Sequence, residues 1–215
     1  MNAPTAIVLA AGEGSRMGGP KALLVVDGKP LVRAHVERLL EAGCRPMVVV
    51  RRGMAENVRA VLRAASGARI VASDTSSMAA SLVVGLRHAA PTAGSAIVVS
   101  TVDCLPVRHS TLCALLHAVL ANGAQVATPC YQGRGGHPVV ARESLLQLFL
   151  RGYPGTLRDI IRAAETRRVR LEVDDPAVVA DLDTPDDLAA ARPGLVPVFA
   201  RLGAGFGFSF ANGAD

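Results

Sequence analysis

Aromatic side chains are scarce in this chain of 215 residues, in which aromatic residues make up 3%, with no Trp, two Tyr and five Phe. Proteins that bind single-stranded nucleic acid stack bases on aromatic side chains, so the shortage argues against that class. No run of Lys and Arg exceeds two residues, and a continuous basic stripe along a nucleic-acid backbone is therefore not predicted either. We expect no nucleic-acid partner.

Long apolar runs are also missing. The longest, 6–11, has six residues, far fewer than the roughly 20 needed to cross a bilayer. The segment before it has no basic residue and so does not resemble a secretory signal. The four cysteines form neither a C-x-x-C pair nor a Cys/His ligand spacing, which argues against a zinc site or a redox pair. The prediction is a cytoplasmic protein with reduced thiols and no membrane partner.

Charge is distributed unevenly along the chain, whose net charge is +5. Residues 1–170 carry 21 basic and 10 acidic side chains, a net of +11, whereas residues 171–215 carry 2 basic and 8 acidic, a net of −6. A basic body favours an anionic partner such as a nucleotide. Only Lys21 and Lys29 among the basic residues are lysines, which marks the first 30 residues as a place where a compact charge is preferred.

Strand-like and helix-like segments alternate along most of the chain. The predicted strands are 6–10, 46–50, 68–72, 95–100, 124–129, 168–173 and 178–182, with a glycine-rich turn into a short strand over 131–141. The predicted helices are 30–43, 55–65, 77–89, 108–121, 143–151, 156–165 and 184–192. The strand over 95–100 is the richest in β-branched residues and is expected at the centre. This pattern predicts a three-layer α/β/α fold with a mostly parallel, twisted sheet.

The domain is expected to cover residues 1–192. Residues 193–215 interrupt the alternation and contain four of the five phenylalanines together with several glycines. This composition favours a poorly ordered tail, and a segment that packs on a partner is the alternative.

A glycine-rich loop follows the first predicted strand but matches neither standard phosphate-binding motif. A dinucleotide fingerprint needs a third glycine where Met17 stands, and a Walker A loop needs a lysine where Pro20 stands. Small residues nevertheless let backbone N–H groups approach an anion, and Arg16 and Lys21 add two positive charges. The loop therefore suits a triphosphate. A tight turn with two surface cations is the alternative.

The same loop resembles the signature L-A-(A/G)-G-x-(S/G)-x-R-M-G-x-x-K of the MobA-like nucleotidyltransferases, which are similar to the molybdenum-cofactor guanylyl- and cytidylyltransferases. The matching positions are Leu9, Ala10, Ala11, Gly12, Arg16, Met17, Gly18 and Lys21. The resemblance implies a nucleotide-diphospho-sugar transferase-like, Rossmann-like fold. It also implies that the loop, with Gly14 and Ser15, wraps the phosphates of an NTP. Arg16 and Lys21 would then act as catalytic residues that neutralise charge as pyrophosphate leaves.

Two further segments resemble nucleotide and metal elements of the family. Residues 74–86 resemble its nucleotide-holding loop and helix, which implies roles for Ser77 and Ser81, although a serine here also suits a helix N-cap. TVDCLP (101–106) resembles its metal-binding motif, with the spacing stretched to D-x-x-P. This match implies that Asp103 is a catalytic, metal-binding carboxylate.

The last two resemblances concern the acceptor and the second metal ligand. GRGGHPVV (133–140) resembles the acceptor segment and implies that Gly136 and His137 bind substrate. ADLDTPDDL (180–188) contains Asp181 and Asp183, which strand alternation would place on one face, so the residues alone leave both open. The resemblance favours Asp183.

These matches imply transfer of CMP from CTP to a phosphorylated acceptor such as molybdopterin, with Mg²⁺ or Mn²⁺ held by Asp103 and Asp183. CTP is favoured because A-A-G over 10–12 resembles the cytidylyl pattern. Such catalysis depends on positioning and charge neutralisation, so no nucleophilic triad is needed. A contact with a molybdoenzyme or an accessory protein is a further expectation.

Two alternatives remain open at this point. Some proteins with this loop resemble nicotine blue oxidoreductase, an NAD(P)H-dependent reductase, and Arg51–Arg52 would then meet a 2′-phosphate. Against this, Arg51 lies about 40 residues beyond the loop, whereas a dinucleotide-binding unit places such a residue roughly 20 beyond it. The third hypothesis is a nucleotide-binding regulator without turnover.

Overall fold

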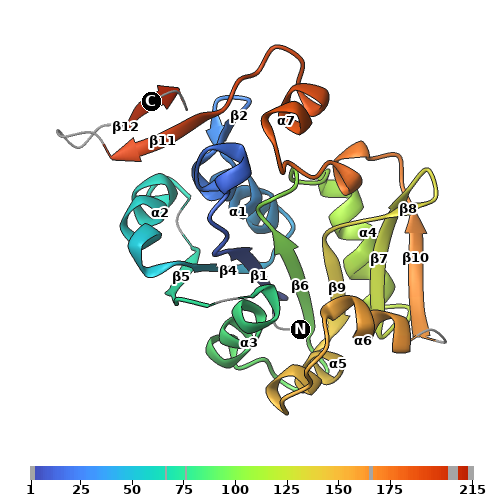
Figure 1. Ribbon diagram of the computed structural model, residues 1–215. Helices are drawn as coiled ribbons and strands as arrows, with labels where there is room; N and C mark the ends of the chain where they lie inside the picture. The colour runs from blue at the N-terminus through green and yellow to red at the C-terminus, as the bar shows by residue number, and fades with distance from the viewer. Residues whose placement is uncertain (1–2, 66, 76, 165–166, 203–207, 213–215) are drawn as a thin grey trace.

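The computed structural model describes residues 3–65, 67–75, 77–164, 167–202 and 208–212. Its main sheet runs in the order β10-β7-β9-β6-β1-β4-β5, with the short β8 paired to β7. The bounds are β1 Thr5–Ala10, β4 Arg45–Val50, β5 Arg69–Ala72, β6 Ala96–Thr101, β7 Val126–Tyr131, β8 Arg134–Gly135, β9 Val139–Arg142 and β10 Arg168–Glu172. Only the pairs that involve β8 or β9 are antiparallel. The prediction of a mostly parallel sheet is confirmed, with β6 in the middle (Figure 1).

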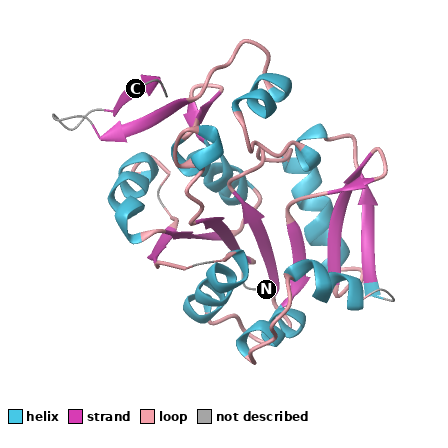
Figure 2. Ribbon diagram, in the orientation of Figure 1, coloured by secondary structure: helices cyan, strands magenta, loops and turns pink. Residues whose placement is uncertain are grey.

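Helices cover both faces of this sheet (Figure 2). Alternate residues of β1 point to opposite sides, Val8 toward a core shared with α1, α2 and α4, and Ile7 toward a core shared with α3, α5 and α6. All six residues of β1 and of β6 are buried, as expected for parallel strands with helices on both faces. The helices are α1 Leu31–Glu41, α2 Ala55–Leu62, α3 Met78–Ala89, α4 His109–Leu120, α5 Glu143–Leu150, α6 Leu157–Ala163 and α7 Pro185–Ala191. The predicted three-layer α/β/α fold is confirmed.

The strand predicted over 178–182 was wrong. Pro176–Val179 form a short 3₁₀ helix, η5, because Asp175 accepts a hydrogen bond from the backbone of Ala177 and Pro176 occupies the first turn. Asp181 makes only an isolated β-bridge with Cys104. The alternation argument for Asp181 and the following aspartate therefore does not apply, since both lie outside regular structure.

Part of 193–215 forms regular secondary structure, and the expected poor order of this segment stays a prediction. The strands β11 (Val198–Leu202) and β12 (Phe208–Asn212) pair as an antiparallel hairpin beside α2 (Figure 1). Phe199 is only 5% exposed, because its ring packs in an apolar cluster with Met17 and Leu24. Residues 203–207 and 213–215 lie outside the described residues, and the domain boundary at 192 stays a prediction.

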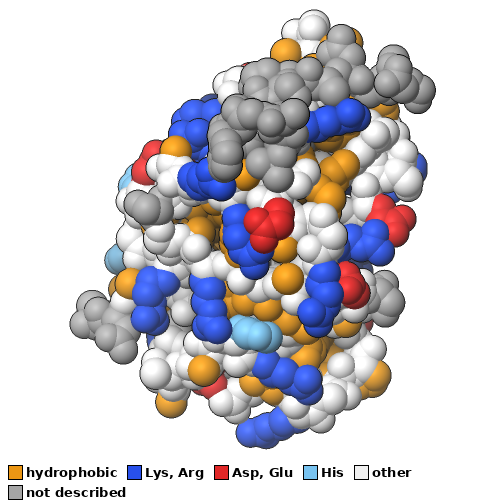
Figure 3. Space-filling view, turned by 90° about the vertical axis from the view of Figure 1, so that its left-hand side faces the viewer, with side chains coloured by type: hydrophobic (Ala, Val, Ile, Leu, Met, Phe, Trp, Pro, Cys, Tyr) orange, Lys and Arg blue, Asp and Glu red, His pale blue; other side chains and the backbone are white. Residues whose placement is uncertain are grey.

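Short elements connect the loop after β1 to α1. They are the 3₁₀ helices η1 (Ser15–Met17) and η2 (Lys21–Leu23) and the two-residue strands β2 (Val25–Val26) and β3 (Lys29–Pro30), and η3 (Arg52–Met54) precedes α2. In the described part of the chain, no helix is both long and apolar enough to cross a membrane. On the face that includes α2 and β5, Lys and Arg side chains stand in separate groups (Figure 3).

Candidate functional site

The loop after β1 is folded back on itself around Gly14. The carbonyl of Gly14 accepts hydrogen bonds from the N–H groups of Met17 (2.9 Å) and Gly19 (3.2 Å). Gly14 has a φ of +65°, and a Cβ there would lie 2.0 Å from the carbonyl oxygen of Gly19. Only glycine fits this position, so the local sequence determines the tight loop that places Arg16 and Lys21.

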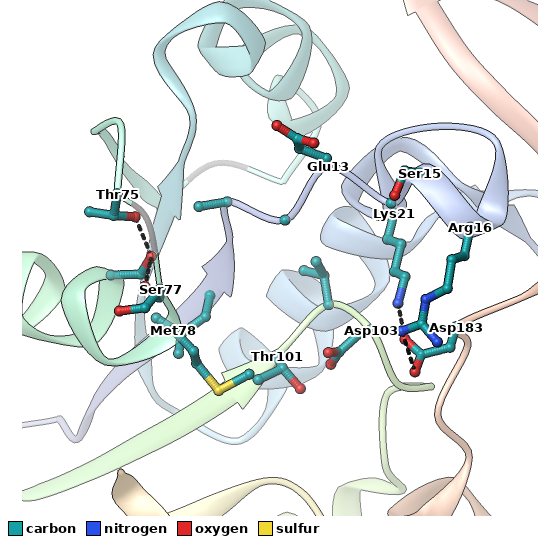
Figure 4. A pocket seen from close by; sticks show the side chains of 16 residues that line it. Glu13, Ser15, Arg16, Lys21, Thr75, Ser77, Met78, Thr101, Asp103 and Asp183 are labelled. Carbon is teal, nitrogen blue, oxygen red and sulfur yellow. Dashed lines mark hydrogen bonds and ion pairs between the residues drawn. The ribbon is translucent and has the colours of Figure 1, made fainter. Parts of the chain in front are cut away.

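This loop forms one wall of a cavity of about 440 Å³ at the carboxyl ends of β1 and β6 (Figure 4). The cavity is lined by Leu9, Ala11, Gly12, Glu13, Gly14, Ser15, Arg16, Lys21, Thr75, Ser77, Met78, Ser81, Thr101, Val102, Asp103 and Asp183. Every residue predicted to bind the nucleotide is among them except Ala10. The side chain of Ala10 is buried in the core on the α1 side of β1, because alternation along the strand turns it away from the cavity.

The two predicted cations meet one predicted metal ligand. Lys21 Nζ lies 2.5 Å from Asp183 Oδ1, and Arg16 Nη2 lies 3.0 Å from Asp183 Oδ2 (Figure 4). The hydrogen bond from Lys21, followed by the charges of Lys21 and Arg16, holds the pKa of Asp183 below its usual range. Asp183 therefore neutralises the same two groups that an incoming phosphate would contact.

Asp103 is placed by the turn that follows β6. Cys104 in this turn is held by His35, whose Nε2 lies 2.9 Å from the Cys104 carbonyl. Burial lowers the pKa of His35, so the ring is neutral and its Nε2–H donates to that carbonyl. The N–H of Leu182 donates to the carbonyl of Asp103 at 2.6 Å. The turn and the 180–183 segment therefore lie side by side, which brings Asp103 and Asp183 into one cavity.

The serine segment has a structural role as well as a place in the cavity. Ser77 Oγ accepts a hydrogen bond from the N–H of Ala80 at 3.1 Å and caps α3. Ser81 Oγ lies 2.5 Å from the hydroxyl of Thr75. In Figure 4, Thr75 and Ser77 lie on the opposite side of the cavity from Lys21 and Asp183. Both the capping role and the cavity position apply to Ser77.

A second pocket, of about 770 Å³, adjoins the first and shares Met78, Asp103 and Asp183 with it. The predicted substrate residues Gly136 and His137 line it. A Cβ on Gly136 would lie 1.7 Å from the Val178 carbonyl oxygen, so this glycine permits close packing of η5.

Burial shifts the pKa of both His137 and Asp181, which line this second pocket. Burial lowers the pKa of His137, and its Nδ1 is buried with no hydrogen-bond partner among the described residues. Burial, followed by the charge of Asp103, raises the pKa of Asp181. Asp181 lines the second pocket only, whereas Asp183 lines both.

The carboxylates suit a divalent cation only together with substrate. Within the described ranges, no three His, Cys, Asp or Glu side chains are arranged as a ready-made metal site. Mg²⁺, however, is bound through one or two carboxylates plus phosphate oxygens and water. Asp103 and Asp183, in one cavity beside Arg16 and Lys21, fit that donor set.

The sequence reasoning missed one group of residues completely. Five arginines line the second pocket, namely Arg134, Arg158, Arg162, Arg168 and Arg170. The spacing of these arginines in the sequence could have indicated the cluster, because residues four apart share a helix face and residues two apart share a strand face. Arg158 and Arg162 have the first spacing on α6, and Arg168 and Arg170 have the second on β10.

A parallel sheet with a cation-bearing glycine loop at its carboxyl edge defines an α/β protein that binds a phosphorylated ligand. The chain belongs to the MobA-like NTP transferase domain family, whose model matches residues 6–171.

Curated relatives with different printed activities are similar to the chain. It is 33% identical over 175 residues to the bifunctional protein GlmU of Anaeromyxobacter sp. (strain K), covering 78% of this chain and 35% of that protein. It is 34% identical over 148 residues to nicotine blue oxidoreductase of Paenarthrobacter nicotinovorans, covering 63% of this chain and 69% of that protein. It is 32% identical over 173 residues to molybdenum cofactor guanylyltransferase of Rhizobium meliloti, covering 78% and 72%. The chain thus spans about a third of GlmU and about seven tenths of the other two.

Solved structures share the whole fold. Rv0371c of Mycobacterium tuberculosis H37Rv has a TM-score of 0.76 at 26% identity, over 90% of this chain and 100% of that one. Its complex with manganese has a TM-score of 0.73 at 25% identity, over 89% and 98%. A nucleotidyl transferase from Methanothermobacter thermautotroptrophicus (Mth528) has a TM-score of 0.72 at 26% identity, over 89% and 97%.

Proposed function

We propose that the protein is a nucleotidyltransferase that transfers a nucleoside monophosphate from an NTP to a phosphorylated acceptor. A phosphate oxygen of the acceptor attacks the α-phosphorus, the bond from that phosphorus to the bridging oxygen breaks, and pyrophosphate leaves. The observation that carries the proposal is that two pockets meet at Asp103 and Asp183. One pocket holds the glycine loop and two cations, and the other holds the predicted acceptor residues.

The ion pairs of the first cavity support a defined order of contacts. Triphosphate oxygens take the place of Asp183 on Lys21 and Arg16, since a phosphate offers the same acceptor geometry with more charge. Asp183 is then released toward Asp103, and these two carboxylates would hold Mg²⁺ or Mn²⁺. When bound, such an ion withdraws charge from the phosphates. Arg16 and Lys21 stabilise the negative charge that develops on the leaving pyrophosphate.

The sequence resemblance favours CTP and molybdopterin as the first substrates to test. The support for CTP is the A-A-G sequence over 10–12. The support for a molybdenum-cofactor acceptor is the similarity to a relative named as a molybdenum cofactor guanylyltransferase, a name that also makes GTP the first competitor.

The test is pyrophosphate release with CTP, GTP, UTP or ATP, each with Mg²⁺ or Mn²⁺ and molybdopterin. Asp103→Asn should lower the rate about 100-fold or more, because charge stabilisation at the reacting phosphate is lost. Asp174→Asn is the matched control, since it removes one exposed carboxylate outside both pockets. Unchanged release by Asp103→Asn would remove Asp103 from the reaction.

An NAD(P)H-dependent reductase is the second candidate, because nicotine blue oxidoreductase is among the similar proteins. In this chain, however, Arg51 is paired with Glu13 at 2.5 Å and Arg52 with Asp74 at 3.3 Å, so a 2′-phosphate would have to displace two carboxylates. Loss of NADH absorbance with a quinoid dye and no NTP would favour the reductase. A shift in melting temperature with CTP but no pyrophosphate would favour a regulator.

A further inference from the structure

The second pocket is strongly polarised. Three carboxylates, those of Asp103, Asp181 and Asp183, come from the turn after β6 and the 180–183 segment. The five arginines come from three other elements, α6, β10 and β8. On the face shown in Figure 3, basic side chains are spread over the surface in separate groups. The concentration of guanidinium groups around one cavity therefore points to an anionic ligand.

Among the described residues, these arginines are less compensated than the cations of the first cavity. None of the five forms an ion pair with a carboxylate within the part of the chain that the structure describes. Arg168 Nε is buried without a hydrogen-bond partner there, and its Nη2 reaches only the hydroxyl of Thr128, at 3.4 Å. Burying an uncompensated guanidinium is unfavourable. By contrast, Arg16 and Lys21 of the first cavity share Asp183 as a partner.

The second pocket has room for two parts of an acceptor, its attacking phosphate and another group. The phosphate that attacks the NTP must lie near Asp103 and Asp183, which both pockets share. The arginine-bearing walls are then left for another part of the acceptor. A volume of about 770 Å³ is in the range of sites for whole small molecules and exceeds the needs of one phosphate. The unpartnered Nδ1 of His137 offers one more polar contact.

We propose that the acceptor carries, besides its reacting phosphate, a second anionic group, a carboxylate or a phosphate, that is bound by Arg158, Arg162 and Arg168. The proposal rests on the proposed function, the nucleotidyl transfer, but it names a different acceptor class from molybdopterin, which carries one phosphate and no carboxylate. A planar guanidinium binds either anion through two parallel hydrogen bonds. These arginines are specificity-determining residues that select acceptors with two anionic groups.

The test uses two probes that differ in one group. 3-Phosphoglycerate and glycerol 3-phosphate share the same phosphate, but the first has a carboxylate where the second has a hydroxymethyl group. Isothermal titration of the full chain with Mg²⁺ should show about tenfold tighter binding of 3-phosphoglycerate, the size expected for one charge-assisted contact.

Arginine variants test which residues cause the preference for 3-phosphoglycerate. Arg158→Gln and Arg162→Gln, both on the exposed side of α6, should each weaken 3-phosphoglycerate binding about five- to tenfold and change glycerol 3-phosphate less than about twofold. Arg63→Gln, an exposed arginine outside both pockets, is the matched control and should change neither. Thermal melting checks that each variant is folded.

Equal affinity for the two probes, no binding of either at millimolar concentration, or a preference that survives both variants would overturn the proposal. The result is independent of the transfer reaction. If the preference depends on Arg162 but no NTP yields pyrophosphate, the proposed reaction fails while the anion pocket stands. If pyrophosphate is released but 3-phosphoglycerate is not preferred, the proposed reaction is supported and the binding of a second anionic group by the arginines is refuted.

Discussion

Asp175 provides a sharp test of how the second pocket is supported. Its carboxylate is 2% exposed and meets three hydrogen-bond donors. Oδ2 accepts from the N–H of Arg108 at 2.7 Å and from the hydroxyl of Thr111 at 2.8 Å. Oδ1 accepts from the N–H of Ala177 at 3.2 Å. The residue therefore ties the N-terminus of α4 to η5, whose Val178 carbonyl contacts the loop carrying His137.

Replacing Asp175 by Asn keeps the shape of the side chain but changes one oxygen to an NH₂ group. In its best orientation the amide oxygen still accepts from Arg108 and Thr111, and the NH₂ then faces the N–H of Ala177, which is a contact between two donors. One hydrogen bond is lost and the other two lose their charge assistance. These changes should lower the free energy of unfolding by about 2 kcal/mol and the melting temperature by about 4–8 °C.

The assay is urea unfolding at neutral pH, with the midpoint compared at unchanged m-value. Asp174→Asn is the matched control because its side chain is 94% exposed, it removes the same charge, and it should cost less than about 0.5 kcal/mol. If Asp175→Asn and Asp174→Asn unfold at the same urea concentration, the assignment of Asp175 as a support of η5 is refuted.

Two further predictions concern His35 and the β11 hairpin. Burial lowers the pKa of both His35 and His137 below 6.5, so the unfolded chain binds protons that the folded chain does not. The free energy of unfolding should therefore fall as the pH drops below about 6.5, and His35→Gln should make that fall shallower. If urea unfolding shows an equal fall for the unchanged protein and for His35→Gln, the role assigned to His35 is contradicted. Phe199→Ala should cost about 3 kcal/mol because a buried ring is lost, whereas Val196→Ala, at 62% exposure, should cost under about 0.5 kcal/mol. Equal midpoints for these two variants would show that Phe199 does not stabilise the domain.

The predictable parts of the site are short segments, each of which carries a local motif. The glycine loop, Arg16 and Lys21 lie within one short segment after a buried strand, so local pattern and family resemblance sufficed to bring them together. Asp181 and Asp183 were singled out from the sequence, but the strand predicted over 178–182 was wrong. There, Asp175 and Pro176 start a 3₁₀ helix, and this local capping outweighed the apolar run that suggested a strand.

The arginine-lined pocket was not predictable in the same way. Its side chains come from α6, β8 and β10, and only packing of α6 and η5 against the sheet turns separate surface residues into one lining. The same holds for Phe199, which lies in the segment rich in phenylalanine and glycine over 193–215 and whose ring packs with Met17 and Leu24 only in the folded chain.

The sequence alone determined most of the order of strands and helices and the two-sided burial of the sheet, because hydrophobic periodicity is a local property of each segment. Tertiary structure decided which distant charges meet. Asp183 contacts Lys21 across 162 residues of chain, because the turn after β6 holds the 180–183 segment at the edge of the sheet. Ion pairs and pockets depend on distances that only packing sets, and for this reason the pairing of Asp183 with both Arg16 and Lys21 is visible only in the folded chain.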